Sequence, residues 1–128
     1  MTLNFQQLQG ALDALNGLKE EKMPFKLSLL IAKDIGILQK ELDFYIEQER
    51  KFATEYLEFD ENGMPVMQGE NMYKIKEDKR EECAEAREAL NAFTCDCEVR
   101  MIPLSLLENL EMTPAQLEGL EILLDEEA

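Results

Sequence analysis

The sequence predicts an α+β domain: an N-terminal antiparallel helical hairpin with a long second helix, a small antiparallel sheet, and two short C-terminal helices. Three observations support this prediction. Apolar residues recur every three or four positions over residues 5–18 and 25–57, which is the helical period. Residues 64–68, 72–76 and 95–101 instead alternate between apolar and polar, which is the strand period. Two helix-capping patterns follow residue 104.

The first helix begins after Asn4, which can cap it because Gln7 stands at the third helical position. Pro24 opens the second helix, and only Gly36 interrupts residues 25–57. A helix of about 33 residues is about 50 Å long, against about 30 Å for a small domain. Part of it must therefore project, pair with another chain, or pack lengthwise on the first helix. The short link KEEKMP favours a hairpin over about residues 4–58.

The stretch EFDENGMPVMQGE (residues 58–70) resembles the first half of a calcium-binding loop, because oxygen-bearing side chains occupy alternate positions before Gly63. Gly69 stands where that loop needs glutamate, and Pro65 stands where it needs an apolar residue with a backbone donor. We therefore interpret the stretch as a turn that ends the long helix, with residues tolerant of positive φ at Asn62 and Gly63. Metal-dependent activity at this loop is kept as an alternative.

Two short runs, MPVMQ and MYKIK, predict a hairpin, and a third helix is expected over about residues 77–92. The alternation over 95–101 predicts a half-buried strand. Ser105 with Glu108 and Thr113 with Gln116 form capping-box patterns for the two short helices, the second with Pro114 at its first position. We find no long linker and predict one domain over residues 1–128, with the sheet and later helices over about 64–125.

The composition restricts the chemistry. Histidine is absent, and the cysteines number three. A structural zinc site needs four ligands, so Cys95 and Cys97, on one face of the predicted strand, are interpreted as buried thiols, and no metal or other cofactor is expected. We find no nucleophile motif, phosphate loop or His–Asp pairing and therefore predict that the chain is not an enzyme.

The net charge of −15 points to basic partners, since nucleic acids and anionic membranes repel such a chain. No apolar run reaches the roughly 20 residues that span a bilayer, and the N-terminal residues lack a signal-peptide pattern. We expect the protein in the cytosol of a bacterial host or associated with a virion. Charge and expected exposure nominate seven partner-contact residues: Asp43, Tyr45, Glu47, Arg50, Tyr56, Glu118 and Glu121.

Two segments carry a resemblance to a known group of proteins. They are LQGALDALNGLKEEKMPFKLSLLIAKDIGILQKELDFYIEQERKFATEYLEFDENG and the ending IPLSLLENLEMTPAQLEGLEILLDEE. The order of elements resembles small acidic phage and prophage proteins of Gram-positive bacteria that form a domain family of unknown function. The resemblance covers most of the chain, concerns helices and turns, and transfers no site residues. It implies a small protein encoded by a phage.

These observations predict a non-enzymatic phage or prophage accessory protein that acts by protein–protein contact, with itself or with a basic host or phage protein. One mechanism is self-association in virion assembly. The alternative is inhibition of a host nucleic-acid-binding defence protein, in the manner of an anti-CRISPR protein, through an acidic surface that imitates phosphates. The same acidic residues can instead form a solvated surface that keeps the protein soluble.

Overall fold

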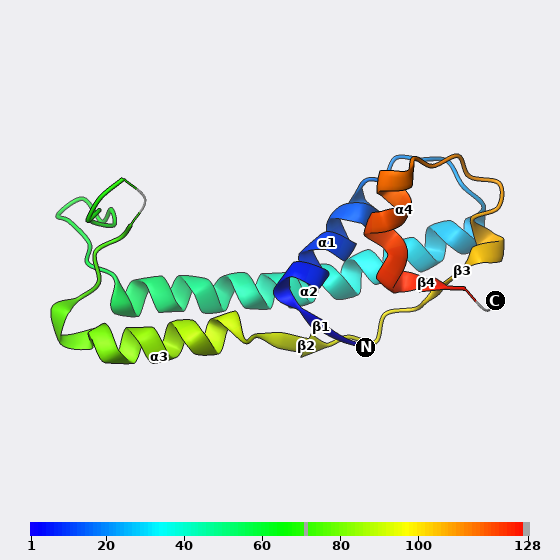
Figure 1. Ribbon diagram of the computed structural model, residues 1–128. Coiled ribbons are helices and arrows are strands. Elements are labelled where there is room, and N and C mark those ends of the chain that lie inside the picture. The colour runs from blue at the N-terminus through cyan, green and yellow to red at the C-terminus, as the bar shows by residue number, and fades with distance from the viewer. Residues whose placement is uncertain (71, 127–128) are drawn as a thin grey trace. The chain divides into compact units, whose positions relative to one another are not determined.

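The computed structural model contains two compact units and describes residues 1–70 and 72–126 (Figure 1). Unit 1 comprises residues 1–43 and the chain from residue 94, and unit 2 comprises residues 44–93. Both boundaries differ from the junction near residues 58–64 that the sequence suggested, and the single domain over 1–128 stays a prediction. The predicted α+β class is confirmed, with four α-helices and a two-stranded antiparallel sheet in the described part.

Unit 1 holds the chain's N-terminal elements and the elements after residue 93. Strands β1 and β2 pair antiparallel with Leu3 opposite Cys95, and β3 and β4 pair parallel with Ile102 opposite Leu124. The elements of unit 1 are β1 (Thr2–Asn4), α1 (Phe5–Asn16), the N-terminal half of α2 (Phe25–Tyr56), β2 (Thr94–Asp96), β3 (Ile102–Pro103), the 3-10 turn η2 (Leu104–Leu106), α4 (Pro114–Leu120), the 3-10 turn η3 (Glu121–Leu123) and β4 (Leu124–Asp125).

The predicted start of α1 is confirmed by a complete capping box. Asn4 Oδ1 accepts the backbone N–H of Gln7 at 2.8 Å, and Gln7 Oε1 accepts that of Asn4 at 3.0 Å. The helix buries its leucine face and lies against α4, which begins with the predicted Thr113–Gln116 capping box. The core of unit 1 is therefore rich in leucine, and its buried leucines are Leu3, Leu8, Leu12, Leu15, Leu18, Leu27, Leu38, Leu107, Leu120 and Leu123.

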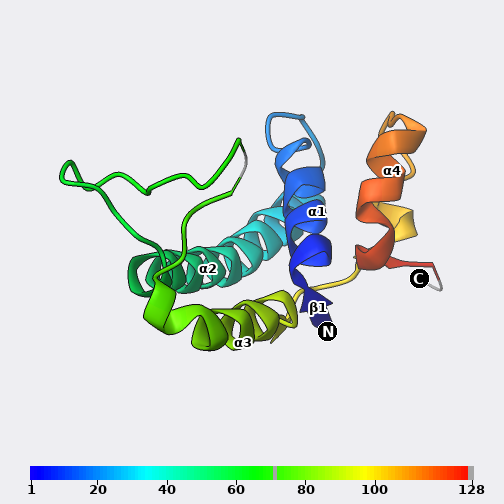
Figure 2. The ribbon, with the colours of Figure 1, turned by 60° about the vertical axis from the view of Figure 1, so that its left-hand side comes forward.

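Unit 2 contains the C-terminal half of α2, the 3-10 turn η1 (Glu77–Lys79) and α3 (Arg80–Asn91). The long helix is confirmed, since α2 runs unbroken from Phe25 to Tyr56. Helix α3 lies beside the C-terminal half of α2 in both views (Figure 1, Figure 2). Few side chains are buried here, and the buried hydrophobic ones among the described residues are Tyr45 and Cys83.

The segment between the two helices of unit 2, residues 57–76, is here called the cap. A two-strand hairpin was predicted there, but three short stretches each pair with the other two through isolated bridges. Three backbone bonds close a ring: the N–H of Glu58 donates to Lys74 O at 2.9 Å, that of Lys74 to Val66 O at 2.7 Å, and that of Val66 to Glu58 O at 2.9 Å. The two predicted runs therefore do pair antiparallel, at Met67 and Tyr73, but residues 57–59 join them in a small closed three-way junction.

Two further predictions are wrong, and one strand was missed. Ser105 caps no helix, since residues 104–106 form a single 3-10 turn after Pro103. The strand predicted over 95–101 ends at Asp96, and Met101 is 38% exposed. The N-terminal strand β1 was not expected, because three residues are too few to show an alternating pattern.

Candidate functional site

The predicted contact residues divide between the two units. Glu118 and Glu121 are exposed in unit 1, as is Asp43, which accepts a hydrogen bond from Gln39 Nε2 at 2.9 Å. In unit 2, Arg50 donates to both carboxylate oxygens of Glu47, at 2.6 and 3.0 Å. This hydrogen-bonded pair lowers the pKa of Glu47 and raises that of Arg50. Of the predicted contact residues, the carboxylates in unit 1 are exposed, whereas the one in unit 2, Glu47, already forms an ion pair with Arg50.

The expected exposure is wrong for Tyr45. Its side chain is only 9% exposed, and its ring lies 5.0 Å from that of Phe93, centroid to centroid. The hydroxyl donates to Glu49 at 2.6 Å, and burial followed by this carboxylate raises the pKa of Tyr45. Tyr56 is half-buried against Phe52, and desolvation is the main cause of its raised pKa. These two tyrosines help hold unit 2 together.

Helix pairing in unit 2 depends on residues that the sequence did not single out. Arg87 of α3 binds both carboxylate oxygens of Glu49, and its guanidinium carbon lies 4.9 Å from the centre of the Phe52 ring. The hydrogen bonds from Arg87 are the main cause of the lowered pKa of Glu49. Nothing in the sequence links Arg87 to Glu49, because 38 positions separate them. The sequence indicated only that Glu49 lies one helical turn after Tyr45, which allows those two side chains to meet.

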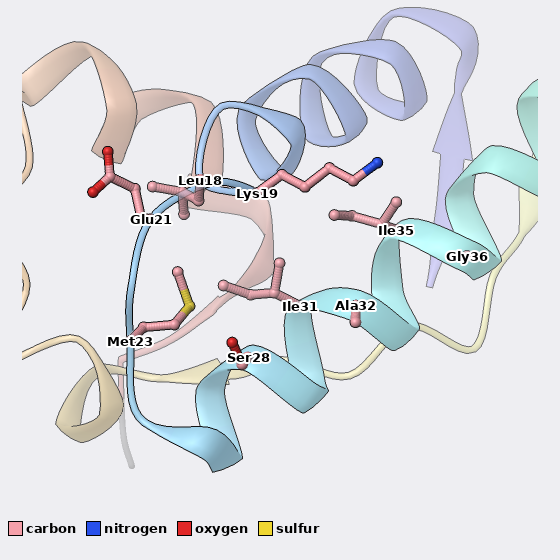
Figure 3. Close-up of a pocket in the computed structure, with 9 residues that line it drawn as sticks. All are labelled: Leu18, Lys19, Glu21, Met23, Ser28, Ile31, Ala32, Ile35 and Gly36. Atoms are coloured by element: carbon pink, nitrogen blue, oxygen red, sulfur yellow. The ribbon is translucent and has the colours of Figure 1, made fainter.

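A groove in unit 1 lies between α2 and the link before it (Figure 3). It has a volume of about 370 Å³, and its walls include Leu18, Met23, Ile31 and Ile35. Near it, at the start of α2, Phe25 is 77% exposed. Apolar surface of this kind on a helix marks a place where a partner can bury side chains. The sequence showed the helix but could not show which apolar residues remain uncovered.

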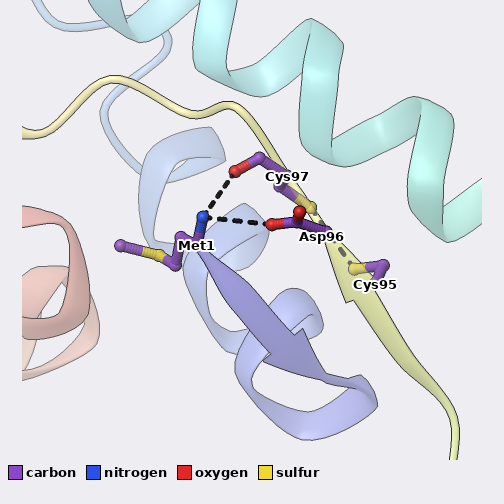
Figure 4. Close-up of polar contacts among 4 residues, drawn as sticks. All are labelled: Met1, Cys95, Asp96 and Cys97. Carbon is purple, nitrogen blue, oxygen red and sulfur yellow. Dashed lines mark hydrogen bonds and ion pairs between the residues drawn. The ribbon is translucent and has the colours of Figure 1, made fainter.

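The thiol pair of unit 1 is buried, as predicted (Figure 4). The Sγ atoms of Cys95 and Cys97 lie 3.3 Å apart. Burial, with a further contribution from Cys95, raises the pKa of Cys97 to about 12, so this thiol stays protonated at neutral pH. Beside it, the amine of Met1 bonds to Asp96 at 3.3 Å and to the carbonyl of Cys97 at 3.1 Å. The pair therefore belongs to the packed end of the β1–β2 sheet.

Two carboxylates of residues 58–70, those of Glu58 and Asp60, have protein partners. Asp60 Oδ1 accepts the backbone N–H groups of Asn62 and Met64 at 2.9 and 3.0 Å, and Gly63 has φ +77°. Glu58 Oε2 lies 3.1 Å from Lys74 Nζ. Gly63 thus lies in a turn with positive φ, as predicted, but this turn does not end the long helix, because α2 already ends at Tyr56, and the φ of Asn62 is not positive. Among the described residues, no group of three or more acidic or cysteine side chains is placed to hold a metal ion.

Comparison of the chain with models of known families, with curated proteins and with solved structures finds no match. Within the described residues, no helix combines the length and the apolar character needed to cross a membrane. The case for a function therefore depends on the surfaces and contacts described above.

Proposed function

We propose that this protein acts by protein–protein contact and not by catalysis. The observation that carries the proposal is the imbalance in unit 2 between its buried and its exposed apolar side chains. Of the seventeen buried hydrophobic residues in the described chain, only Tyr45 and Cys83 belong to unit 2. The large hydrophobic residues that unit 2 leaves exposed are Phe44, Ile46, Phe59, Met64, Met67, Met72 and Tyr73.

A small unit with so little buried surface gains stability by covering its apolar side chains with another protein. The exposed residues suit this role. Aromatic residues and methionine are enriched at protein interfaces, and the flexible methionine side chain adapts to irregular surfaces. Five of these residues lie in the cap, where Met64 is 62% and Met72 66% exposed. The cap is thus the part of unit 2 best suited to meet a partner.

Sedimentation velocity over about 1–200 µM tests the proposal, with the wild type compared with the cap variant Phe59→Ser/Met64→Ser/Met72→Ser. We expect the wild type to associate and the variant to associate at least tenfold more weakly. The control is Met101→Ser/Leu104→Ser, which removes exposed apolar residues from unit 1. A chain that stays monomeric over this range, and that binds no purified structural protein of a phage carrying its gene, would contradict the proposal.

The setting that we propose for this contact is a phage or prophage, where the chain would serve as an accessory protein in virion assembly. The support is the resemblance in the order of elements described above. A neighbouring position of the gene among tail or capsid genes would agree with this role. A position among early genes that counter host defence would favour the second candidate function.

That second candidate is inhibition of a basic nucleic-acid-binding protein of the host. Exposed glutamates on one side of α3 favour it: Glu81, Glu85 and Glu88 follow one another at helical spacing. Binding would then compete with nucleic acid and weaken steeply between 50 and 300 mM salt, because opposite charges are screened. Affinity that does not change over this range would exclude this mechanism.

A further inference from the structure

The exposed side of α2 in unit 1 carries an apolar stripe. Phe25, Leu29, Ala32 and Gly36 recur at the spacing of one helix face. All four are exposed, Phe25 by 77% and Leu29 by 41%, and a Cβ added at Gly36 would meet nothing within 4 Å. The groove of Figure 3 lies along one side of the stripe, where Ile35 faces it. A second helix can approach this stripe closely at its small residues.

A row of lysines runs along the other side of the stripe. Lys26, Lys33 and Lys40 stand seven residues apart and are exposed. Asp34 is the single acidic residue among residues 25–40, and it is fully buried. These lysines, here called the lysine face, concentrate positive charge on α2 in a chain whose net charge is −15, and Glu41, Asp96 and Glu98 line the same depression as Lys33 and Lys40. Its natural counterpart is an acidic helix that also carries small side chains.

Helix α3 of unit 2 has such a surface. Glu81, Glu85 and Glu88 form an exposed row, and Glu81 and Glu88 repeat the seven-residue spacing of the lysines. Ala84, also exposed, lies beside this glutamate row. A helix turns by about 100° per residue. On α2 the lysine row, and on α3 the glutamate row, therefore lie on the same rotational side of the apolar or small residues next to them. When two such helices face each other antiparallel, their charged rows lie on the same side.

We propose that the lysine face of one molecule binds the glutamate row of a second copy, with α2 and α3 antiparallel. The inference rests on the proposed function, since it names a second copy as the partner and adds a second contact surface to the cap. Opposite charges then meet along the contact, and Phe25 and Leu29 are covered. An antiparallel contact between two α2 helices would instead bring both lysine rows together, which costs free energy.

The proposed contact is heterologous, because it joins two different surfaces. Each molecule in a complex keeps one free lysine face or one free glutamate row, so association continues until a ring closes or a filament grows. A protein that contributes to a virion can use either outcome. Association should also weaken as salt rises, since the contact depends on charge.

Charge exchange tests the inference in the full-length protein. The face variant is Lys26→Glu/Lys33→Glu, and the row variant is Glu81→Lys/Glu88→Lys. In sedimentation velocity at 50 mM salt we expect each variant alone to associate at least tenfold more weakly than the wild type. A mixture of the two, and a chain carrying all four changes, should recover the wild-type affinity within about threefold, because opposite charges again face each other.

Two matched variants control for net charge. Glu108→Lys/Glu111→Lys makes the same charge change as the row variant, and Gln6→Glu/Gln9→Glu/Lys51→Glu makes the same change as the face variant. All of these positions are exposed, and both controls should associate like the wild type. Circular dichroism establishes that each variant is folded. Unchanged association of the face and row variants would overturn this inference and leave the proposed function standing. Loss of association without recovery in the mixture would also overturn it, as would a wild type that is monomeric at 200 µM.

Discussion

Asp34 is a buried carboxylate in the core of unit 1. Its Oδ1 accepts the backbone N–H of Arg100 at 2.8 Å, while its Oδ2 has no hydrogen-bond partner among the described residues. Desolvation dominates over this hydrogen bond and raises the pKa of Asp34. The folded state therefore binds this proton more tightly than the unfolded chain does. Ionisation of Asp34 lowers the free energy of unfolding as pH rises above the ordinary aspartate pKa.

For Asp34→Asn we expect a variant that still accepts the Arg100 N–H and has no charge to bury. Relative to the wild type, its free energy of unfolding should increase as pH rises from about 4 to 7, by about 1 kcal/mol or more. Urea denaturation at several pH values measures this difference. A difference that is constant with pH would show that Asp34 keeps its ordinary pKa in the folded protein.

Helices α1 and α4 of unit 1 approach each other closely at Gly119. A Cβ added at Gly119 would lie 2.9 Å from the Cβ of Ala14, which cannot move without its helix. Glycine is needed here for space and not for backbone conformation. The sequence showed a glycine in a short helix, but it did not show that a second helix lies at this distance.

Gly119→Ala should therefore lower the free energy of unfolding by about 1–3 kcal/mol through overpacking. Gly10→Ala in α1 is the matched control, because a Cβ there meets nothing within 4 Å. It should raise stability by up to about 1 kcal/mol, since alanine favours helix. Thermal and urea unfolding of the two variants measure the difference. Equal effects would mean that α1 and α4 lie further apart in solution.

The two ion pairs on the C-terminal half of α2 should contribute differently to the free energy of unfolding. Glu49 and Arg87 are each about one-third exposed and join two helices, whereas Glu47 and Arg50 lie on one exposed turn. A double-mutant cycle to alanine should give a coupling energy of about 1 kcal/mol for the first pair and no measurable coupling for the second. Because the pKa of Glu49 is lowered, its coupling should persist at neutral pH and disappear as pH falls through that lowered value. Equal coupling energies would contradict this.

At the scale of the molecule, the two units differ in how much apolar surface they bury. Unit 1 contains fifteen of the seventeen buried hydrophobic residues in the described chain, and unit 2 contains two. Local opening is easiest where few buried contacts hold the backbone. The stability of unit 2 should therefore depend on a partner far more than that of unit 1.

Hydrogen exchange should show this difference directly. At about 1 µM we expect amides of residues 57–76 to exchange faster than those of α1, and their protection to increase when the protein is concentrated to about 200 µM. Mass spectrometry of peptides from both units measures the rates. Amides of α1, which serve as the internal control, should change little. Protection of unit 2 that is equal to that of unit 1 and independent of concentration would contradict the proposed function.

The elements that could be predicted are those set by local rules. The capping boxes at Asn4 and Thr113, the helix from Phe25 to Tyr56 and the positive φ of Gly63 follow from side chains and backbones a few residues apart. Contacts between residues far apart in the sequence could not be predicted from these local rules. The contact of Arg87 with Glu49, the burial of Asp34 and the ring of bonds in the cap each join separate segments. The lysine face depends on both the sequence and the tertiary structure. The seven-residue spacing of its lysines is set by the sequence, but only the packing of α2 against other elements decides which face of this helix remains exposed.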